Sequence, residues 1–139
     1  MMITLDSDVL TGLLRGDAGL QARLAAVPEA DQSITIIVAE EILRGRLNSI
    51  RQASAGRGRV TVEQAYALLQ STIGDLQQFA ILPYSARAEV HFQACRRQKI
   101  RVGTRDLRIA AIAMAENATL VTRNVRDFGQ VPGLTVEVW

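Results

Sequence analysis

The sequence predicts a single α/β domain, residues 1–139, in which a small central parallel sheet of four to five strands lies between two layers of helices. Short apolar runs alternate with segments of helical periodicity along the whole chain. Its 139 residues, 48% of them hydrophobic and 22% charged, suffice for one globular core. Alternating strands and helices give a parallel sheet with helices on both faces.

The first half of the chain is expected to contain two strands and three helices. MITL is a short apolar run that ends at acidic residues, and SITIIV is a β-branched run, typical of a buried strand. The helix after SITIIV has Leu43, Leu47 and Ile50 on one stripe, and the turn-rich SAGRGR ends it. In order, the expected elements are a strand at 2–5, helices at 9–16 and 19–27, a strand at 33–38 and a helix at 40–53.

The second half repeats this alternation. Thr61 and Gln64 form a capping-box pattern at the start of a helix expected to run to Phe79, and Pro83 stops the strand AILP. Thr104 is expected to cap the helix RDLRIAAIAMAE. The remaining elements are a strand at 80–83, helices at 85–98 and 105–116, and strands at 118–122 and 134–138.

Acidic residues follow nearly every predicted strand. Asp6 ends the first strand, Glu40 and Glu41 follow the second, Asp106 lies in a first helical turn, and Asp127 follows ATLVT. The carboxyl ends of parallel strands form the ligand-binding edge of such sheets, so these acids are expected at one edge. Taken singly, each acid is also explained by helix capping or by the helix dipole.

Several carboxylates from separate segments repel one another unless a cation joins them. Hard divalent ions such as Mg²⁺ take oxygen ligands and keep some water molecules. Such an ion activates water and neutralises charge on a phosphoryl group. The pattern therefore favours a metal-dependent reaction of a phosphodiester.

The basic residues are almost all arginine, with Lys99 the lone lysine, and they form two groups. The guanidinium fork suits phosphate recognition, so the groups favour a polyanionic substrate; the alternative is a solvated surface rich in arginine. Arg44, Arg51 and Arg105 are the residues we expect to bind such a substrate. The first group is Arg44, Arg46, Arg51, Arg57 and Arg59, and the second is Arg96, Arg97, Lys99, Arg101, Arg105 and Arg108.

Other site chemistries find little support. The single Cys95 excludes an internal disulfide and a cysteine-cluster zinc site, and His91 is the only histidine. No apolar run is long enough to span a membrane, and the N-terminus lacks the pattern of a signal peptide. A cytoplasmic location is therefore expected.

Three segments have the order and spacing of a known family: ITLDSDVL (3–10), VAEEILRG (38–45) and the long run from Gly103 to Trp139 that begins GTRDLRIAAIAMAENATLVTRNVRDF. In these segments the chain resembles the PIN-domain ribonucleases, specifically the VapC-type toxins of bacterial toxin–antitoxin modules. The resemblance spans nearly the whole chain. It implies a PIN-like fold and a Mg²⁺- or Mn²⁺-dependent endoribonuclease. It also implies a homodimer and a small antitoxin protein as partner.

The resemblance also implies roles for individual residues. Asp6, Glu41 and Asp106 match the three acids, with Asp6 and Asp106 as direct metal ligands and Glu41 acting through water or a second metal. Thr122 matches a hydroxyl that positions Asp6. Ser7 keeps the hydroxyl that follows the first acid.

The chain departs from the family pattern at three positions. Asn124 stands where many members have a fourth acid, and Asp127, three residues on, is usual in the VapC branch and is the expected substitute. Asp8 stands where an amide is common, and Arg105 where an asparagine often precedes the third acid. Asp127 is alternatively a turn residue.

Helical spacing and the motif disagree about the second acid. Glu40, not Glu41, aligns with the stripe of Leu43, Leu47 and Ile50. Gly45, one turn after Glu41, leaves open space beside that glutamate. The motif favours Glu41, and Glu40 remains the alternative.

Two rival functions remain. The Asp6–Asp8 pair after an apolar strand is typical of haloacid-dehalogenase phosphotransferases, but Leu10 stands where that family has Thr or Val. A catalytically weak or inactive PIN-like module that binds RNA or protein is the other, suggested by Asn124 and Asp8. The helix from Val62 to Phe79, apolar on more than one face, is a candidate interface for the homodimer.

Overall fold

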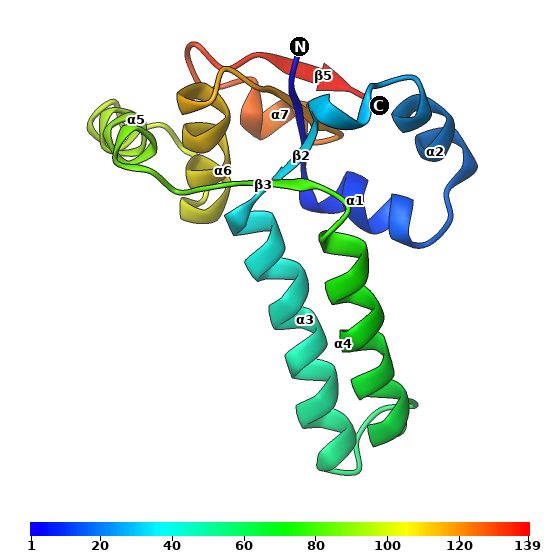
Figure 1. Cartoon of the computed structure of the whole chain (residues 1–139). Coiled ribbons are helices and arrows are strands. Elements are labelled where there is room, and N and C mark those ends of the chain that lie inside the picture. Colours follow the sequence, from blue (N-terminus) through cyan, green and yellow to red (C-terminus); the bar gives the residue numbers. More distant parts are fainter.

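The computed structural model describes residues 1–139, with a central sheet and helices packed around it (Figure 1). All neighbouring strands pair in parallel, in the order β3-β2-β1-β4-β5. The predicted α/β class with a parallel sheet of four to five strands is therefore confirmed. The strands are β1 (Ile3–Leu5), β2 (Gln32–Thr35), β3 (Ala80–Leu82), β4 (Thr119–Thr122) and β5 (Val136–Val138).

The strand order fixes where the helices lie. From β1 the chain proceeds to β2 and β3 on one side, then returns past β1 to β4 and β5 on the other. Because such crossovers are right-handed, helices of the two halves cover opposite faces, and the order reverses between β1 and β4. The helices are α1 (Ser7–Leu14), α2 (Ala18–Ala25), α3 (Ile36–Ser54), α4 (Val62–Leu76), α5 (Ala86–Arg97), α6 (Thr104–Ala115) and α7 (Val125–Phe128).

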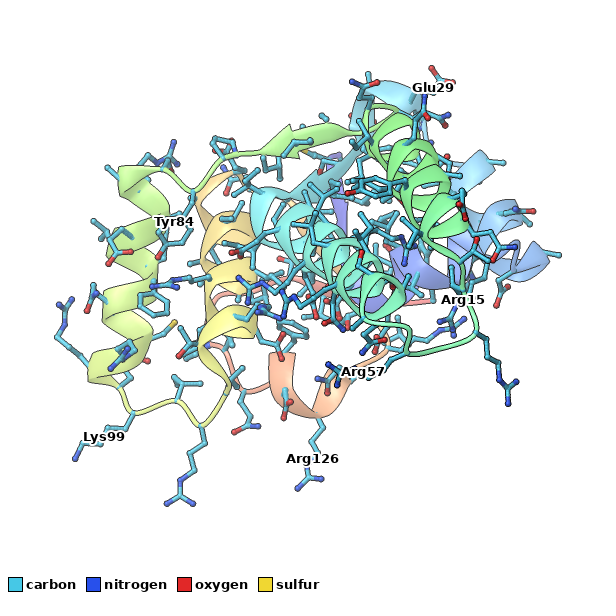
Figure 2. The ribbon with its side chains drawn as sticks, turned by 90° about the horizontal axis from the view of Figure 1, so that it is seen from below. Arg15, Glu29, Arg57, Tyr84, Lys99 and Arg126 are labelled. Atoms are coloured by element: carbon cyan, nitrogen blue, oxygen red, sulfur yellow. The ribbon has the colours of Figure 1, made fainter.

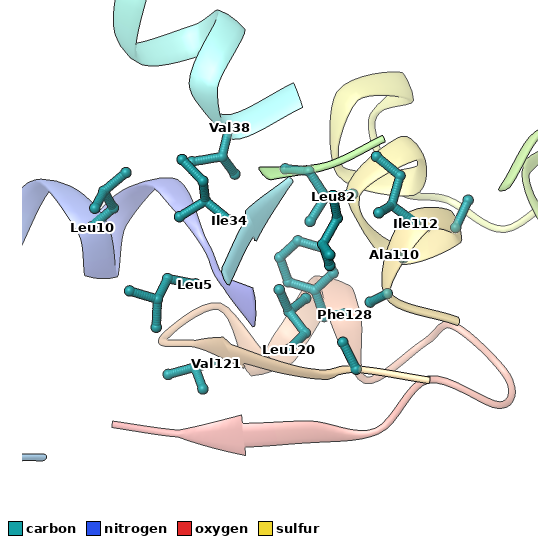
Figure 3. Close-up of a cluster of buried hydrophobic side chains, with 14 of the residues drawn as sticks. Leu5, Leu10, Ile34, Val38, Leu82, Ala110, Ile112, Leu120, Val121 and Phe128 are labelled. Carbon is teal, nitrogen blue, oxygen red and sulfur yellow. The ribbon is translucent and has the colours of Figure 1, made fainter. Parts of the chain in front are cut away.

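The core lies on both faces of the central strands. Figure 3 shows side chains of β1, β2 and β4, among them Leu5, Ile34 and Leu120, packed with side chains of the covering helices such as Phe128 of α7. All four are at most 1% exposed. Because both faces are covered, every residue of β1 and β4 is buried, including Thr4, Thr119 and Thr122.

Several predicted boundaries are wrong. The run at 33–38 is a strand only to Thr35, whose hydroxyl accepts a hydrogen bond from the backbone N–H of Val38 (3.1 Å) and so starts α3. The helix expected to reach Phe79 ends at Leu76, and Gly103, not Thr104, is the N-cap of α6.

Two further features bear on the prediction of local structure. The capping box of Thr61 and Gln64 is present at the start of α4. The short helix α7 is not predicted by the sequence, which indicates only a turn around Asp127.

Helices α3 and α4 form a hairpin, the helical arm (residues 36–76), which projects from the sheet in Figure 1. Arg46 joins the two helices by donating from Nε to the Thr72 hydroxyl (2.8 Å). Arg57 lies near the tip of the arm (Figure 2). The arm exposes several apolar side chains: Leu47, Val60, Val62, Tyr66, Leu68 and Ile73. None of the helices in this chain combines the length and apolar character that a membrane span requires.

Candidate functional site

Asp6 lies at the carboxyl end of β1, where the strand order reverses. Its Oδ1 accepts a hydrogen bond from the backbone N–H of Ser7 (2.8 Å), which makes it the N-cap of α1. Its Oδ2 accepts from the Thr122 hydroxyl (2.8 Å). The residue is only 6% exposed. Asp6 is thus both a helix cap and a buried carboxylate at the binding edge of the sheet.

Thr122 ends β4 and links Asp6 to the following turn. Its fully buried hydroxyl donates to Asp6 and accepts from the backbone N–H of Asn124 (2.9 Å). Asn124 caps α7: its Oδ1 accepts from the N–H of Asp127 (3.3 Å), and its Nδ2 donates to Asp127 Oδ2 (3.1 Å). A continuous chain of hydrogen bonds therefore runs from Asp6 to Asp127.

Glu41, and not Glu40, faces this chain of residues. The Ser7 hydroxyl donates to Glu41 Oε2, and Arg105 Nη1 lies 3.6 Å from Glu41 Oε1. Glu40 instead pairs with Arg44 at 2.7 Å on the exposed side of α3. A side chain at Gly45 would meet no atom within 4 Å, so the space beside Glu41 is open.

Asp106 lies in the first turn of α6, close to the other acids. Burial, together with the charges of Asp6, Glu41, Asp127 and Asp8, raises its pKa to about 6. Burial also raises the pKa of Asp6, although the hydrogen bonds from Thr122 and Ser7 oppose this. The structure therefore places four other carboxylates within electrostatic reach of Asp106.

This donor set suits a hard divalent cation such as Mg²⁺ or Mn²⁺, because every candidate ligand is a carboxylate. As the side chains stand, no three of them are grouped tightly enough to hold one ion. Mg²⁺ needs only one or two carboxylates, since it keeps several water molecules. Direct ligation by Asp6 and Asp106, with Glu41 acting through water, stays a prediction.

The three arginines expected to bind RNA do not lie together. Arg44 and Arg105 line a cavity of about 250 Å³ between α3 and α6. Arg51 lies ten residues beyond Glu41 on α3, roughly 15 Å along the helix axis. Arg108 lines the same cavity and was not singled out by sequence reasoning. Arg108 lies three residues after Arg105 on the same helix, and this spacing is the sequence signal that places the two arginines on one face.

The raised pKa of Asp106 predicts that acid stabilises the metal-free protein. The unfolded chain binds this proton only near pH 4, whereas the folded chain holds it to about pH 6. Stability in EDTA should fall as the pH rises from about 4 to about 7, by ~1 kcal/mol after discounting solvent screening. Thermal melting across this range tests it, and Asp106→Asn should flatten the curve. A curve that rises with pH and is the same in both proteins would contradict the assignment.

Comparison with known proteins places this fold and site in context. The PIN domain family matches residues 3–134. Ribonuclease VapC2 of Rickettsia felis is 37% identical over 68 residues, which are 46% of this chain and 51% of that protein. The tRNA(fMet)-specific endonuclease VapC of Salmonella typhimurium is 31% identical over 70 residues, 48% of this chain and 53% of that protein. The chain spans about half the length of the curated relatives it matches.

Solved structures share the whole architecture. VapBC2 from Rickettsia felis, bound to a DNA fragment of its promoter, covers 100% of this chain and 99% of its own, with a TM-score of 0.77 and 24% identity. FitAcB from Neisseria gonorrhoeae covers 97% of this chain and 96% of its own, with a TM-score of 0.78 and 20% identity. At these identities the likeness establishes the fold.

Proposed function

Because the chain belongs to the PIN domain family, we propose that it is a metal-dependent endoribonuclease that hydrolyses phosphodiester bonds in RNA as the toxin of a toxin–antitoxin pair. One observation carries the proposal: acids from three separate elements, Asp6, Glu41 and Asp106, gather at the carboxyl edge of the sheet. The chain is similar to VapC ribonucleases, which supports RNA cleavage as the activity.

Asp6 and Asp106 are the residues that would hold Mg²⁺ or Mn²⁺. A bound cation would lower the pKa of a water molecule and neutralise charge on the phosphoryl group. Thr122 and the Ser7 N–H fix the orientation of Asp6, and the Ser7 hydroxyl fixes that of Glu41. We assign Glu41 the task of accepting a hydrogen bond from the attacking water. The water oxygen would form a new P–O bond and lose a proton, while the ester P–O bond breaks and the leaving oxygen takes up a proton from solvent.

Asp127 has a structural and an electrostatic part in this proposal. Its carboxylate accepts a hydrogen bond from the Asn124 side chain, so Asp127 helps to hold the turn after β4. Its charge also raises the pKa of Asp106, so it lies near enough to the site to hold a metal-bound water molecule. Asn124 is then a positioning residue for Asp127 and need not replace a fourth acid.

The proposed partners are an antitoxin protein and a second copy of the chain. The exposed apolar side chains of the helical arm, such as Tyr66 and Leu68, support a protein-binding role for that surface. The solved VapBC complexes with the same fold support the antitoxin as partner. A cytoplasmic location accords with an RNA substrate.

The activity is tested by incubating total RNA with the protein in Mg²⁺ and in EDTA. We expect cleavage in Mg²⁺ and at least ~100-fold slower cleavage in EDTA, because the metal contribution is worth several kcal/mol. As a control, adding excess Mn²⁺ to the EDTA-treated protein should restore cleavage, which shows that the chelator has not inactivated the protein. Equal cleavage with and without chelator would indicate a contaminating metal-independent nuclease. No cleavage in any metal, with RNA still bound, would favour the inactive RNA-binding module.

A further inference from the structure

The cavity between α3 and α6 adjoins the carboxylates but is lined by a different set of side chains. Glu41 of α3 and Asp106 of α6 belong to the acidic site, and the residue before each of them, Glu40 and Arg105, lines the cavity. Adjacent residues on a helix point in different directions, so the cavity lies beside the acids. The lining side chains are Ile37, Glu40 and Arg44 of α3 and Thr104, Arg105 and Arg108 of α6. A strand of RNA with a phosphate at the acids would therefore pass next to this cavity.

The charges around the cavity are unequal. Three arginines line it, against one carboxylate, Glu40. Arg44 pairs with Glu40 at 2.7 Å, and Arg105 lies 3.6 Å from Glu41. Arg108 forms no ion pair, although the Glu89 carboxylate lies within electrostatic reach. The cavity thus has an excess of positive charge, which favours an anion.

Arg108 is held in place by aromatic rings rather than by an acid. Its guanidinium carbon lies 4.9 Å from the centre of the Phe92 ring and 5.7 Å from that of Tyr84. Tyr84 lies between α5 and α6 in Figure 2, and its hydroxyl donates to Glu89. These cation–π contacts hold the guanidinium beside the two rings. One of its N–H groups lies close enough to interact with the Tyr84 hydroxyl, and the others remain to donate to an oxyanion.

We propose that this cavity binds one phosphodiester group of single-stranded RNA, that of a nucleotide next to the scissile bond, with Arg108 as the principal contact. Arg105 and Arg44 flank the same phosphate. The inference rests on the proposed function for its substrate, but it concerns binding and does not require cleavage. Arg108 is thereby a substrate-positioning residue outside the carboxylate cluster.

The test measures binding of a short fluorescent oligouridylate in EDTA, at several salt concentrations. Each phosphate contact contributes about 0.7 to the slope of log affinity against log salt for a single strand. Arg108→Gln is expected to reduce the slope by about 0.7. Arg108→Lys, which keeps the positive charge, is expected to retain most of the wild-type slope. Arg97→Gln removes one exposed arginine at the far end of α5 and should leave the slope unchanged.

A second measurement identifies the phosphate. Oligonucleotides with a single neutral methylphosphonate linkage are compared at each position. At one position in the oligonucleotide, the methylphosphonate should weaken binding to the wild-type protein. The same oligonucleotide should bind Arg108→Gln as well as the unmodified one does, because that variant has already lost the contact. Equal slopes for Arg108→Gln and Arg97→Gln, or additive effects at every position, would overturn the proposal. Absence of cleavage in Mg²⁺ together with the predicted slope change would reject the nuclease activity and leave the phosphate site standing.

Discussion

Asp106→Asn is expected to reduce Mg²⁺-dependent RNA cleavage at least about 1000-fold, corresponding to ~4 kcal/mol of transition-state stabilisation. The amide is neutral and a weaker ligand for a hard cation. The fold should survive, because Asp106 is half-buried and its carboxylate is repelled by its neighbours. Above pH 7 the metal-free variant should therefore melt at or above the wild-type temperature.

Single-turnover cleavage of one RNA, with melting of the same samples, measures both effects. Glu116→Gln is the matched control, because it neutralises an acid at the opposite end of α6. That variant should cleave at the wild-type rate. Asp106→Asn protein that cuts RNA at an undiminished rate would show that Asp106 is not a metal ligand.

Thr122→Val is expected to have the largest effect on stability among the residues behind the site, about 1–3 kcal/mol of destabilisation. Valine has the same shape but leaves Asp6 Oδ2 without its donor and the Asn124 N–H without its acceptor. Since the Thr122 hydrogen bond favours the ionised form of Asp6, metal affinity should also fall about 10–100-fold.

Thr4→Val on the adjacent strand is the matched control for this change. Thr4 is also fully buried, but its hydroxyl has no hydrogen-bond partner. The same substitution should therefore raise stability by about 1 kcal/mol, because it removes an unsatisfied polar group. Urea unfolding in EDTA measures both variants, and Mg²⁺ titration follows the affinity. Effects of the same sign in the two variants would refute the role assigned to the Thr122 hydrogen bonds.

The sequence predicted the class of fold because that information is local. Apolar runs and helical spacing report which faces of each element are buried, and their alternation requires a parallel sheet. The boundary at Thr35 was missed because Ile36, Ile37 and Val38 are β-branched, as in a strand. In the structure the Thr35 cap and the burial of Val38 override that preference and begin α3.

The choice between Glu40 and Glu41 shows the limit of periodicity. The stripe of Leu43, Leu47 and Ile50 points to Glu40, but this stripe is not the buried face of α3. Leu47 is exposed, and the buried residues of the helix are Val38, Ala39 and Ile42. Near the edge, Ser7 and Arg105 meet Glu41. The family motif indicates the same glutamate, which helical spacing alone does not.

By itself the sequence determined the α/β architecture, the placement of acids after strands and, through its motifs, membership of a family. Tertiary structure decided that Asp6 both caps α1 and accepts from Thr122, 116 residues away. It also decided that Arg108, and not Arg51, lies in the cavity beside the acids. The physical reason is that side-chain spacing encodes burial within one element. The distance between side chains of different elements, on which a site depends, is set only when those elements pack.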